Sequence, residues 1–390
     1  MAQLYPLMED MIMYDWQRSL VTSMLFSKAF DEIKSEYEKY DKDPFSEVRS
    51  EIETRPIVVY GAGTFCTGVI RTCVSTGFTP MCICDSYKRG SYTYDNTSFD
   101  IISPETLCKK HSDALVIIST LRNSHEIKEK LKHMGFPEKQ IGNIRTKVLM
   151  PPDEFLTKHY EGYEWAYNFF SDALSKQLVL DKIRLLLYGK LLSPNSDSDM
   201  YYEKGFISLS ENELFIDAGA FNGDTIEQFF VKSNNKGNAV AFEPNKSNCE
   251  KIASKFAGTK NVSVVNKGLW SCNDSLVFDA YEHASQGASF IRGSGDIVVP
   301  VTTLDDYVDT SAEKLRPSFI KMDIEGAEKE ALIGCENVIK NYKPKLAICA
   351  YHKPEDIYTL PRQVIQYRDD YKLVLRQHFY CHCDHVLYGA

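Results

Sequence analysis

The chain has 390 residues, of which 43% are hydrophobic, 25% charged and 12% aromatic, so its composition is that of a globular protein and excludes a disordered, collagenous or coiled-coil chain. At about 150 residues per domain, this length predicts two or three domains. The 45 basic and 54 acidic side chains leave a net charge of −9, and without a block of like charges this balance argues against a nucleic-acid partner.

The amino-terminal residues 1–50 predict a helical segment, because Phe26, Phe30, Ile33 and Tyr37 recur at helical spacing. The first residues carry no basic stretch before an apolar run, and no apolar run long enough to span a bilayer. The eleven cysteines form no disulfide framework. We therefore expect free thiols, no membrane span and a cytoplasmic location.

Residues 51–150 predict a small Rossmann-like α/β domain. Its strands are expected over 57–60, 80–84 and 114–119. One helix is expected after Gly61 and another over 124–134. Residues 151–205 predict a helical linker that ends in a stretch rich in serine and aspartate. The alternation of strand and helix then restarts, so residues 206–390 are expected to form a second, larger α/β domain.

The turn after the first expected strand resembles a dinucleotide-binding fingerprint. Its glycines are Gly61 and Gly63, and Asp85 ends the next strand, where an acid would bind a ribose. Cys66 replaces the third glycine, which such a turn needs for close packing of helix on strand. Two interpretations stay open. Gly61, Gly63 and Asp85 form a second nucleotide site, or the domain keeps only the shape and serves acceptor recognition or oligomer contacts.

A second glycine turn opens the larger domain. A buried strand runs into the sequence DAGAFNGDT at 217–225, in which Gly219 and Gly223 leave room for a ligand to approach the backbone. Glu243 ends the next expected strand, where a carboxylate can accept the hydrogen bonds of a ribose diol. This spacing is typical of a nucleoside-binding turn, whereas the glycine turn alone also occurs as a plain strand-to-helix connection.

Carboxylates also follow a later apolar strand. Asp323, Glu325 and Glu328 surround a glycine, and Tyr351 and His352 follow the next apolar strand. Since the carboxyl ends of parallel strands meet at one edge of a sheet, these groups are expected to share a crevice with the glycine turn. The other interpretation of Asp323 and Glu325 is a helix start, whose dipole favours carboxylates.

Taken together, these motifs resemble the FkbM-type S-adenosylmethionine-dependent methyltransferases. The resemblance covers residues 160–390 and is carried by the motifs at 217–225, 242–244, 301–305, 321–328 and 351–356. It implies a class I methyltransferase fold, whose seven-stranded mixed sheet ends in an antiparallel strand, here 385–388. The expected fold class is thus α/β, with two doubly wound Rossmann-like domains.

The resemblance further implies S-adenosylmethionine as the cofactor. The residues expected around its methionine part are Asp217, Gly219, Ala220, Asn222, Gly223, Asp224 and Thr225. Those expected around the nucleoside are Glu243, Pro244 and Asn245 at the ribose, and Asn266 and Lys267 near the adenine. Asp323 would face the sulfonium.

The methyl group of a sulfonium is already activated, so the main task of such a protein is to align an acceptor oxygen and exclude water. Asp323 and Glu325 are the first candidates for a catalytic base, and His352 is the second. A histidine after a strand also serves as a structural hydrogen bonder, which is the alternative for His352.

No metal is expected. The carboxylates of Asp323, Glu325 and Glu328 lie across a strand-to-helix corner and need not converge on one ion. Near the carboxyl terminus stands a set that looks like zinc ligands, namely His378, Cys381, His382, Cys383 and His385. Its C-x-C spacing lacks the paired C-x-x-C of structural zinc sites, and the segment predicts a strand hairpin.

The sequence therefore predicts a cytoplasmic O-methyltransferase that uses S-adenosylmethionine on a hydroxyl of a sugar, glycan precursor or secondary metabolite. Its partner would be a small-molecule or glycan acceptor, and homo-oligomer formation stays open. Two alternatives remain. One is a non-catalytic nucleotide-sensing or scaffold protein that keeps the fold, and the other is an NAD-dependent oxidoreductase acting through the first domain, against which Cys66 argues.

Overall fold

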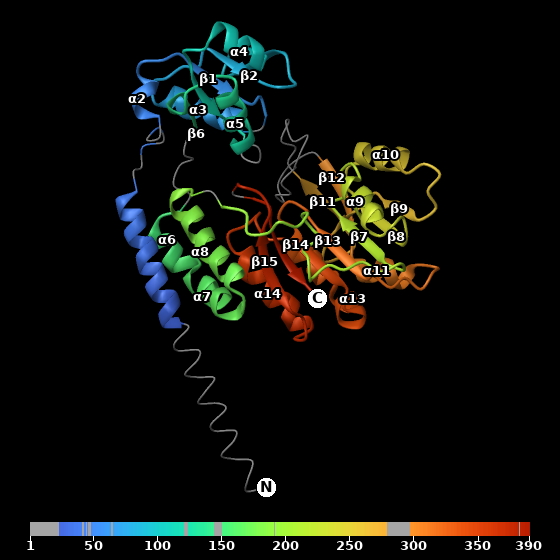
Figure 1. The fold of residues 1–390 in the computed structure, drawn as a ribbon. Helices are drawn as coiled ribbons and strands as arrows, with labels where there is room; N and C mark the ends of the chain where they lie inside the picture. Colours follow the sequence, from blue (N-terminus) through green and yellow to red (C-terminus); the bar gives the residue numbers. More distant parts are fainter. Residues whose placement is uncertain are drawn as a thin grey trace.

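The structure is a computed structural model, which describes residues 23–40, 43, 45, 48–63, 65–120, 124–143, 150–190, 192–278, 297–381 and 383–390. A 6-stranded sheet and a 7-stranded sheet organise two α/β domains. In Figure 1 the domain of the 6-stranded sheet stands apart from the larger body. The expected fold class, α/β with two doubly wound domains, is confirmed.

The first sheet has the order β3-β4-β2-β1-β5-β6, and only β3 runs antiparallel to its neighbour. Its strands are β1 (Ile57–Tyr60), β2 (Cys82–Cys84), β3 (Gly90–Tyr94), β4 (Thr97–Ile102), β5 (Leu115–Ile118) and β6 (Ile141–Asn143). Its helices are α2 (Arg49–Ile52), α3 (Cys66–Ser75), α4 (Pro104–Lys110), α5 (Ser124–His133) and the 3-10 helix η1 (Glu138–Gln140). The central strands β1 and β5 are buried along their whole length, which explains their continuous apolar sequence.

The hairpin of β3 and β4 was not predicted. Tyr94 pairs with Thr97, so Asp95 and Asn96 alone form the turn, and both have a positive φ (44° and 63°). Two left-handed residues define the type I′ turn, whose twist suits a hairpin. Without a glycine this turn has a weak sequence signal, because only aspartate and asparagine tolerate the left-handed region among side-chain-bearing residues with any frequency.

The second sheet has the order β15-β16-β14-β13-β7-β8-β9. Its strands are β7 (Leu214–Ala218), β8 (Asn238–Phe242), β9 (Val262–Val265), β13 (Phe319–Met322), β14 (Lys345–Cys349), β15 (Leu373–Gln377) and β16 (His385–Gly389). Strand β16 is antiparallel to both of its neighbours, and the other pairs are parallel. This is the predicted seven-stranded mixed sheet with its last strand antiparallel.

A separate 3-stranded sheet follows β9 in the chain. It contains β10 (Gly268–Leu269), β11 (Asp274–Phe278) and β12 (Ile297–Thr302), so the apolar run near residue 297 lies outside the main sheet. The helices of this domain are α9 (Asp224–Lys232), α10 (Lys246–Lys255), α11 (Leu304–Thr310), α12 (Glu328–Ile333), α13 (Glu336–Tyr342) and α14 (Asp356–Tyr367).

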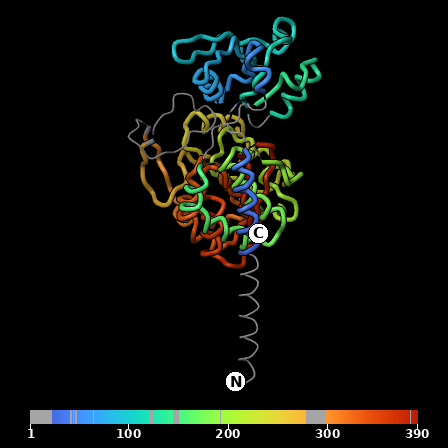
Figure 2. The backbone as a smooth tube through the Cα atoms, turned by 90° about the vertical axis from the view of Figure 1, so that its left-hand side faces the viewer, coloured from blue at the N-terminus to red at the C-terminus, as the bar shows by residue number. Residues whose placement is uncertain are grey.

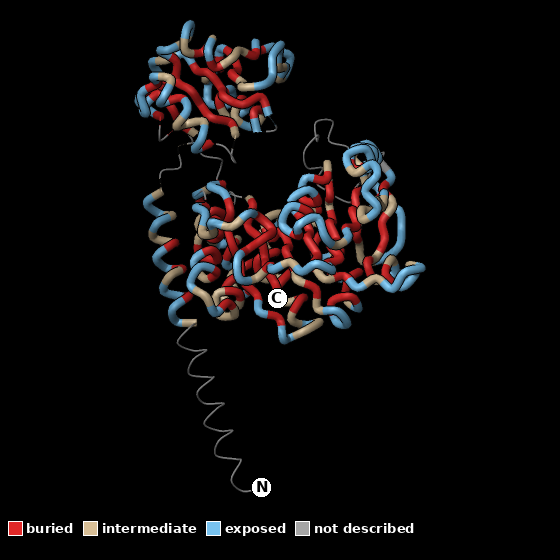
Figure 3. The backbone as a smooth tube through the Cα atoms, turned by 45° about the vertical axis from the view of Figure 1, so that its right-hand side comes forward, coloured by how far each residue is buried: buried red, intermediate tan, exposed pale blue. Residues whose placement is uncertain are grey.

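Two hydrophobic layers enclose the 7-stranded sheet, because successive residues of a strand face opposite sides. On β7, Ile216 belongs to one layer and Phe215 to the other. Figure 3 shows these strands as buried segments inside a body with an exposed surface. Both faces are therefore covered, as parallel strands require.

The helical residues 23–39 pack against helices α6 (Pro152–Lys158), α7 (Tyr160–Phe169) and α8 (Ala173–Tyr188) (Figure 2). The rings of Phe26 and Phe30 lie 5.3 and 5.2 Å from that of Tyr160, and all of these elements join one hydrophobic cluster with the second sheet. Residues 1–22 lie outside the described residues. Among the described helices, none is both long and apolar enough to cross a membrane.

Candidate active site

The candidate site lies at the carboxyl ends of the central strands of the second sheet. The chain passes from β7 outward to β8 and β9 and then returns to β13 on the other side of β7. Ligands of open α/β sheets bind at such a switch point. There the backbone N–H of Asp323 donates to the carbonyl of Ala218 at 3.1 Å, which joins the ends of β7 and β13.

The backbone requires both glycines of the predicted turn. Gly219 has a φ of +79°, and a Cβ at this position would overlap the carbonyl oxygen of Asp323. Gly223 has a φ of +78°, and a Cβ there would lie 2.9 Å from the ring of Phe256. The turn therefore brings bare backbone to the strand edge because no other residue fits.

Asp217 is fully buried and forms an ion pair with Lys321, whose Nζ lies 3.0 Å from Oδ1. The same Nζ donates to the carbonyl of Gly219 at 2.8 Å. Burial raises the pKa of Asp217, an effect that Lys321 partly offsets. Burial lowers the pKa of Lys321, but the charges of Asp217 and Asp323 outweigh it, so the pKa lies above its ordinary value. Through this bond to Gly219, the buried ion pair stabilises the glycine turn.

Glu243 connects the glycine turn to the loop after β8. Its Oε2 accepts the backbone N–H of Phe221 at 2.9 Å, and its Oε1 accepts that of Asn245 at 2.9 Å. Burial raises the pKa of this carboxyl, while the two backbone bonds lower it. Each oxygen keeps one further lone pair, so the group can still accept from a ligand hydroxyl.

The remaining residues of the turn bind one another. The Ala220 carbonyl accepts the N–H of Gly223 at 2.7 Å, Asn222 Oδ1 accepts that of Asp224 at 3.1 Å, and Asp224 Oδ1 accepts that of Thr225 at 2.8 Å. These bonds shape the start of α9, and the carboxylate of Asp224 favours the positive end of its dipole.

The residues expected near the adenine support the same loop. Asn266 Nδ2 donates to the carbonyls of Glu243 and Pro244 at 3.0 and 2.9 Å. The side chain of Asn245 caps α10, and Lys267 is exposed. Asn266 is thus held by the protein backbone, and all three residues are exposed to solvent.

Two tyrosines hold Asp323. The hydroxyl of Tyr201 donates to Oδ2 at 2.8 Å, and that of Tyr351 donates to Oδ1 at 2.9 Å. Burial raises the pKa of Asp323, but Lys321, His352 and the two phenols outweigh it, so the pKa lies below its ordinary value. Asp323 is therefore a carboxylate with a fixed orientation.

His352 lies among three carboxylates. Its Nδ1 is 3.0 Å from Glu328 Oε1, and its Nε2 is 3.4 Å from Glu325 Oε2 and 3.6 Å from Asp323 Oδ1. Burial lowers the pKa of the imidazole, but Glu325 and Glu328 outweigh it and raise the pKa to about 10. The ring is therefore an imidazolium at neutral pH, and the carboxylates converge on this cation. Glu325 and the following Gly326 reach this arrangement with a positive φ of 57° and 95°.

Two residues of the site were not chosen from the sequence. Lys321 carried a usable signal, since a lysine inside the apolar strand Phe319–Met322 must find an acid partner. Tyr201 carried none, because it lies in the stretch expected to be a linker. Its φ of +73° and its N–H bond to the hydroxyl of Tyr388, at 2.9 Å, fix it over the site.

In the glycine turn of the first domain, the carboxylate of Asp85 already accepts hydrogen bonds from the backbone. Asp85 Oδ2 accepts the N–H of Ala62 at 2.8 Å, and Oδ1 accepts the N–H groups of the two residues Tyr87 and Lys88 at 2.8 and 2.9 Å. Burial raises the pKa of Asp85, but these backbone bonds outweigh it and lower the pKa. Gly61 has a φ of +113°, and among the described residues no atom beyond the chain neighbours of Gly63 lies within 4 Å of where its Cβ would be.

Several known proteins are similar to this chain. Residues 217–372 match the family model of the Methyltransferase FkbM domain. The hexuronic acid methyltransferase AglP of Haloferax volcanii is 28% identical over 109 residues, which cover 27% of this chain and 44% of that protein. The chain thus spans less than half the length of this curated relative.

One solved structure is similar to nearly the whole chain. The crystal structure of Methyltransferase FkbM from Methylobacillus flagellatus KT superposes with a TM-score of 0.59 at 21% identity, covering 95% of this chain and 100% of that one. This likeness shows the fold, including an architecture of comparable extent. The family match shows that residues 217–372, in the carboxyl-terminal part of the chain, form an FkbM-type methyltransferase domain, as the motifs predicted.

Proposed function

We propose that this chain is an S-adenosylmethionine-dependent O-methyltransferase that acts on a hydroxyl of a sugar, glycan precursor or secondary metabolite. The observation that carries the proposal is the meeting of Gly219, Glu243 and Asp323 at the switch point of the seven-stranded sheet. The match to the FkbM domain supports the reaction class.

The residues at this edge fit the cofactor. Gly219 and Gly223 keep the turn free of side chains, and both oxygens of Glu243 retain a lone pair for ribose hydroxyls. Asp323 and Glu325 give the edge a negative charge that complements a cationic sulfur. When bound, S-adenosylmethionine would supply a methyl group that needs no further activation.

We assign proton acceptance from the acceptor hydroxyl to Glu325. Its side chain is 35% exposed, compared with 24% for Asp323 and 9% for His352, so it is the member most open to an incoming substrate. Asp323 already accepts two tyrosine hydroxyls, and it would face the sulfonium. His352 carries its proton at neutral pH, so it would orient both carboxylates rather than act as the base.

The acceptor class rests on a single relative. The name of that protein, a hexuronic acid methyltransferase, supports a sugar or glycan acceptor for this chain. For the first domain we favour acceptor recognition over a second nucleotide site, because Asp85 already accepts three backbone N–H groups. The eleven cysteines, all free, support a cytoplasmic location.

Calorimetric titration of the full chain with S-adenosylhomocysteine tests the proposal. We expect micromolar binding, weakened by about 1 to 3 kcal/mol in Glu243→Gln, which loses a buried charged acceptor. The exposed Glu250 gives the matched control Glu250→Gln, whose affinity should equal that of the wild type. A folded chain that does not bind would favour the scaffold alternative, and binding of NAD instead would favour the oxidoreductase.

Transfer itself is measured by mass spectrometry. The full chain is incubated with S-adenosylmethionine and a panel of uronic acids, neutral hexoses and polyphenols. We expect a gain of one methyl group on a sugar hydroxyl, lost in Glu325→Gln while binding of S-adenosylhomocysteine persists. Methylation confined to an amine or to the polyphenols would overturn the assigned acceptor class.

A further inference from the structure

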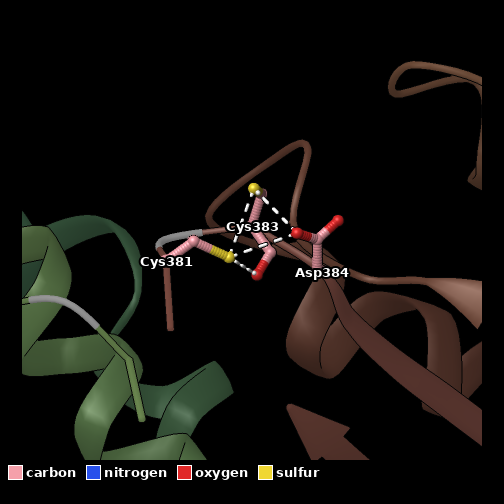
Figure 4. A group of neighbouring side chains, drawn as sticks. All are labelled: Cys381, Cys383 and Asp384. Atoms are coloured by element: carbon pink, nitrogen blue, oxygen red, sulfur yellow. Dashed lines mark hydrogen bonds between the residues drawn. The ribbon is translucent and has the colours of Figure 1, made fainter. Parts of the chain in front are cut away.

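The turn between β15 and β16 brings two thiols and a carboxylate together. The Sγ atoms of Cys381 and Cys383 are 3.4 Å apart, and Asp384 Oδ2 lies 3.2 and 3.3 Å from them. Figure 4 shows all three side chains pointing to a common centre. Three donor atoms thus form a nearly equilateral triangle.

The protein interior fixes this triangle. Cys381 is fully buried and Asp384 is 4% exposed. Gln377 Nε2 donates to the carbonyls of Phe379 and Cys383 at 2.6 and 2.7 Å, so one buried amide holds the turn from inside. Asp384 has a φ of +69°, the left-handed conformation that aims its carboxylate back at the sulfurs.

We propose that Cys381, Cys383 and Asp384 bind a zinc ion, with a water molecule as the fourth ligand. Bond lengths of about 2.3 Å to sulfur and about 2.0 Å to oxygen give a tetrahedron with edges of about 3.8 Å between sulfurs and about 3.5 Å between sulfur and oxygen. The observed separations of 3.2 to 3.4 Å are a few tenths of an ångström shorter, which a small opening of the turn supplies.

The donor set selects the metal. Two thiolates suit a borderline-soft cation such as Zn²⁺, whereas Mg²⁺ and Ca²⁺ take oxygen ligands. Binding replaces the two thiol protons, which are released to solvent, and forms two Zn–S bonds and one Zn–O bond without a change of oxidation state. The site therefore needs no oxidant or reductant.

A buried cation supports an anionic centre at this place. Lys182 is 3% exposed, and in the described part of the chain it has no carboxylate partner within 4 Å. Burial lowers the pKa of Lys182 to about 8, and the charges of Asp356, Cys383 and Cys381, in this order, act against that shift. Two thiolates, one carboxylate and one Zn²⁺ carry a net charge of −1, which the ammonium of Lys182 balances. An anionic centre at the two sulfur atoms would add to the stabilisation that the charge of Asp356 gives this buried ammonium.

Sequence reasoning excluded zinc here because the C-x-C spacing lacks the pairing of C-x-x-C. The turn overcomes the short spacing, since it places both sulfurs on one side and adds Asp384, which was not among the candidate ligands. Of those candidates, His378 is engaged with Ser198 and Tyr388, at 3.1 and 2.7 Å. His382 lies outside the described residues, and His385 is buried with neither ring nitrogen hydrogen-bonded.

The site adjoins the candidate active site through one strand. Ala350 N donates to the carbonyl of His385 at 3.0 Å, and the ring of Tyr351 lies 5.8 Å from that of His385. Tyr351 is one of the two tyrosines that donate to Asp323. A zinc ion would therefore fix the turn that borders the methyl-transfer edge, whatever the acceptor proves to be.

Metal analysis of the purified full chain, prepared with reductant and without chelator, tests the proposal. We expect about one zinc per chain by mass spectrometry, and near-ultraviolet thiolate charge-transfer absorption when cobalt replaces zinc. Cys381→Ser should lose both signals. The exposed Cys272 gives the matched control, and Cys272→Ser should keep both.

A second variant, Asp384→Asn, keeps both thiols and serves as the test if Cys381→Ser fails to fold. Competition with a chelating dye should show zinc affinity reduced by about 10-fold or more in this variant. Zinc-free wild-type protein that takes up none on addition would overturn the proposal. So would equal zinc content in Cys381→Ser and Cys272→Ser, or a Cys381–Cys383 disulfide in protein prepared under reducing conditions.

Discussion

Gly219 and Asp323 are separated by about a hundred residues in the sequence, yet a methyl group on the first would overlap the backbone carbonyl oxygen of the second. This contact joins the glycine turn after β7 to the acidic loop after β13, and it is the point at which the two halves of the doubly wound sheet meet. This contact cannot be relieved by rotating a side chain, because the atom of Asp323 that would be overlapped is its backbone carbonyl oxygen.

We predict that Gly219→Ala abolishes binding of S-adenosylhomocysteine. The matched control is Gly258→Ala, since Gly258 has a similar φ of +84° but no atom within 4 Å of its would-be Cβ. Both variants carry the strain of a left-handed alanine, about 1 to 2 kcal/mol, and only Gly219→Ala adds the overlap. Calorimetry and thermal melts separate the two effects. Equal loss of binding in both variants would contradict this explanation.

Removing one partner of the buried pair of Asp217 and Lys321 should lower the free energy of unfolding more than removing both. Asp217→Ala leaves a buried ammonium, so we expect it to lower the free energy of unfolding by about 3 to 5 kcal/mol. The double variant Asp217→Ala, Lys321→Met removes both charges and should recover a large part of this loss. Urea unfolding measures both values. Additive losses in the double variant would show that the two side chains act independently.

Stability should fall at alkaline pH through His352. The folded-state pKa of about 10 lies above the ordinary value of 6.5, so the imidazolium stabilises the protein fully below about pH 6.5. This contribution, on the order of 5 kcal/mol, is lost as the pH rises towards 10. Urea midpoints measured from pH 7 to 10 should drop more steeply for the wild type than for His352→Gln. Parallel pH profiles would contradict a charged His352.

Tyr351 should keep Asp323 ionised. Removing its hydroxyl in Tyr351→Phe takes away a 2.9 Å bond to the carboxylate, which raises the pKa of Asp323. If Asp323 faces the sulfonium, its carboxylate favours S-adenosylmethionine over S-adenosylhomocysteine, whose sulfur is uncharged. This preference is lost when the pH falls and Asp323 becomes protonated, and in Tyr351→Phe the loss should occur at a higher pH than in the wild type. Tyr202→Phe is the control, because the hydroxyl of Tyr202 donates to the Thr225 carbonyl and not to Asp323. An unchanged pH dependence in Tyr351→Phe would remove Asp323 from this role.

In the first domain, Asp85 should matter for stability and not for the cofactor. Asp85→Ala removes the acceptor of three backbone N–H groups, so we expect a loss of about 1 to 3 kcal/mol. Binding of S-adenosylhomocysteine should be unaffected. The thermal transition of this domain and calorimetry on the same samples check both points, and a loss of cofactor binding would contradict them.

The strand-end motifs were readable because each pairs an apolar run with an abrupt polar ending. DAGAFNGDT and KMDIEG each begin in the last residues of a strand that is buried along its length, so the edge where they meet could be predicted. The motifs could not show which side chains of the site carry a proton. His352 looks like a base in the sequence, and only the three carboxylates of the segment 323–328, which follows a different strand, reverse that role.

Residues fixed by long-range contacts were beyond prediction for the same reason. Tyr201 reaches Asp323 from a stretch with no periodic pattern, and its backbone is held by Tyr388 on the last strand. Asp384 joins the two cysteines through a left-handed turn that no local signal demands. A single sequence contains these residues and their partners, but it does not show which of them come into contact.

The helix over residues 23–39 has a consequence for where the molecule can be divided. Phe26 and Phe30 share one hydrophobic cluster with α6 to α8 and the second sheet, while the first α/β domain occupies the chain between them. The methyltransferase body is therefore discontinuous in sequence, and the small domain is an insertion within it. A cut near residue 50 would strip an aromatic face from the body, whereas excision of 48–143 with the two flanks rejoined would leave that face covered.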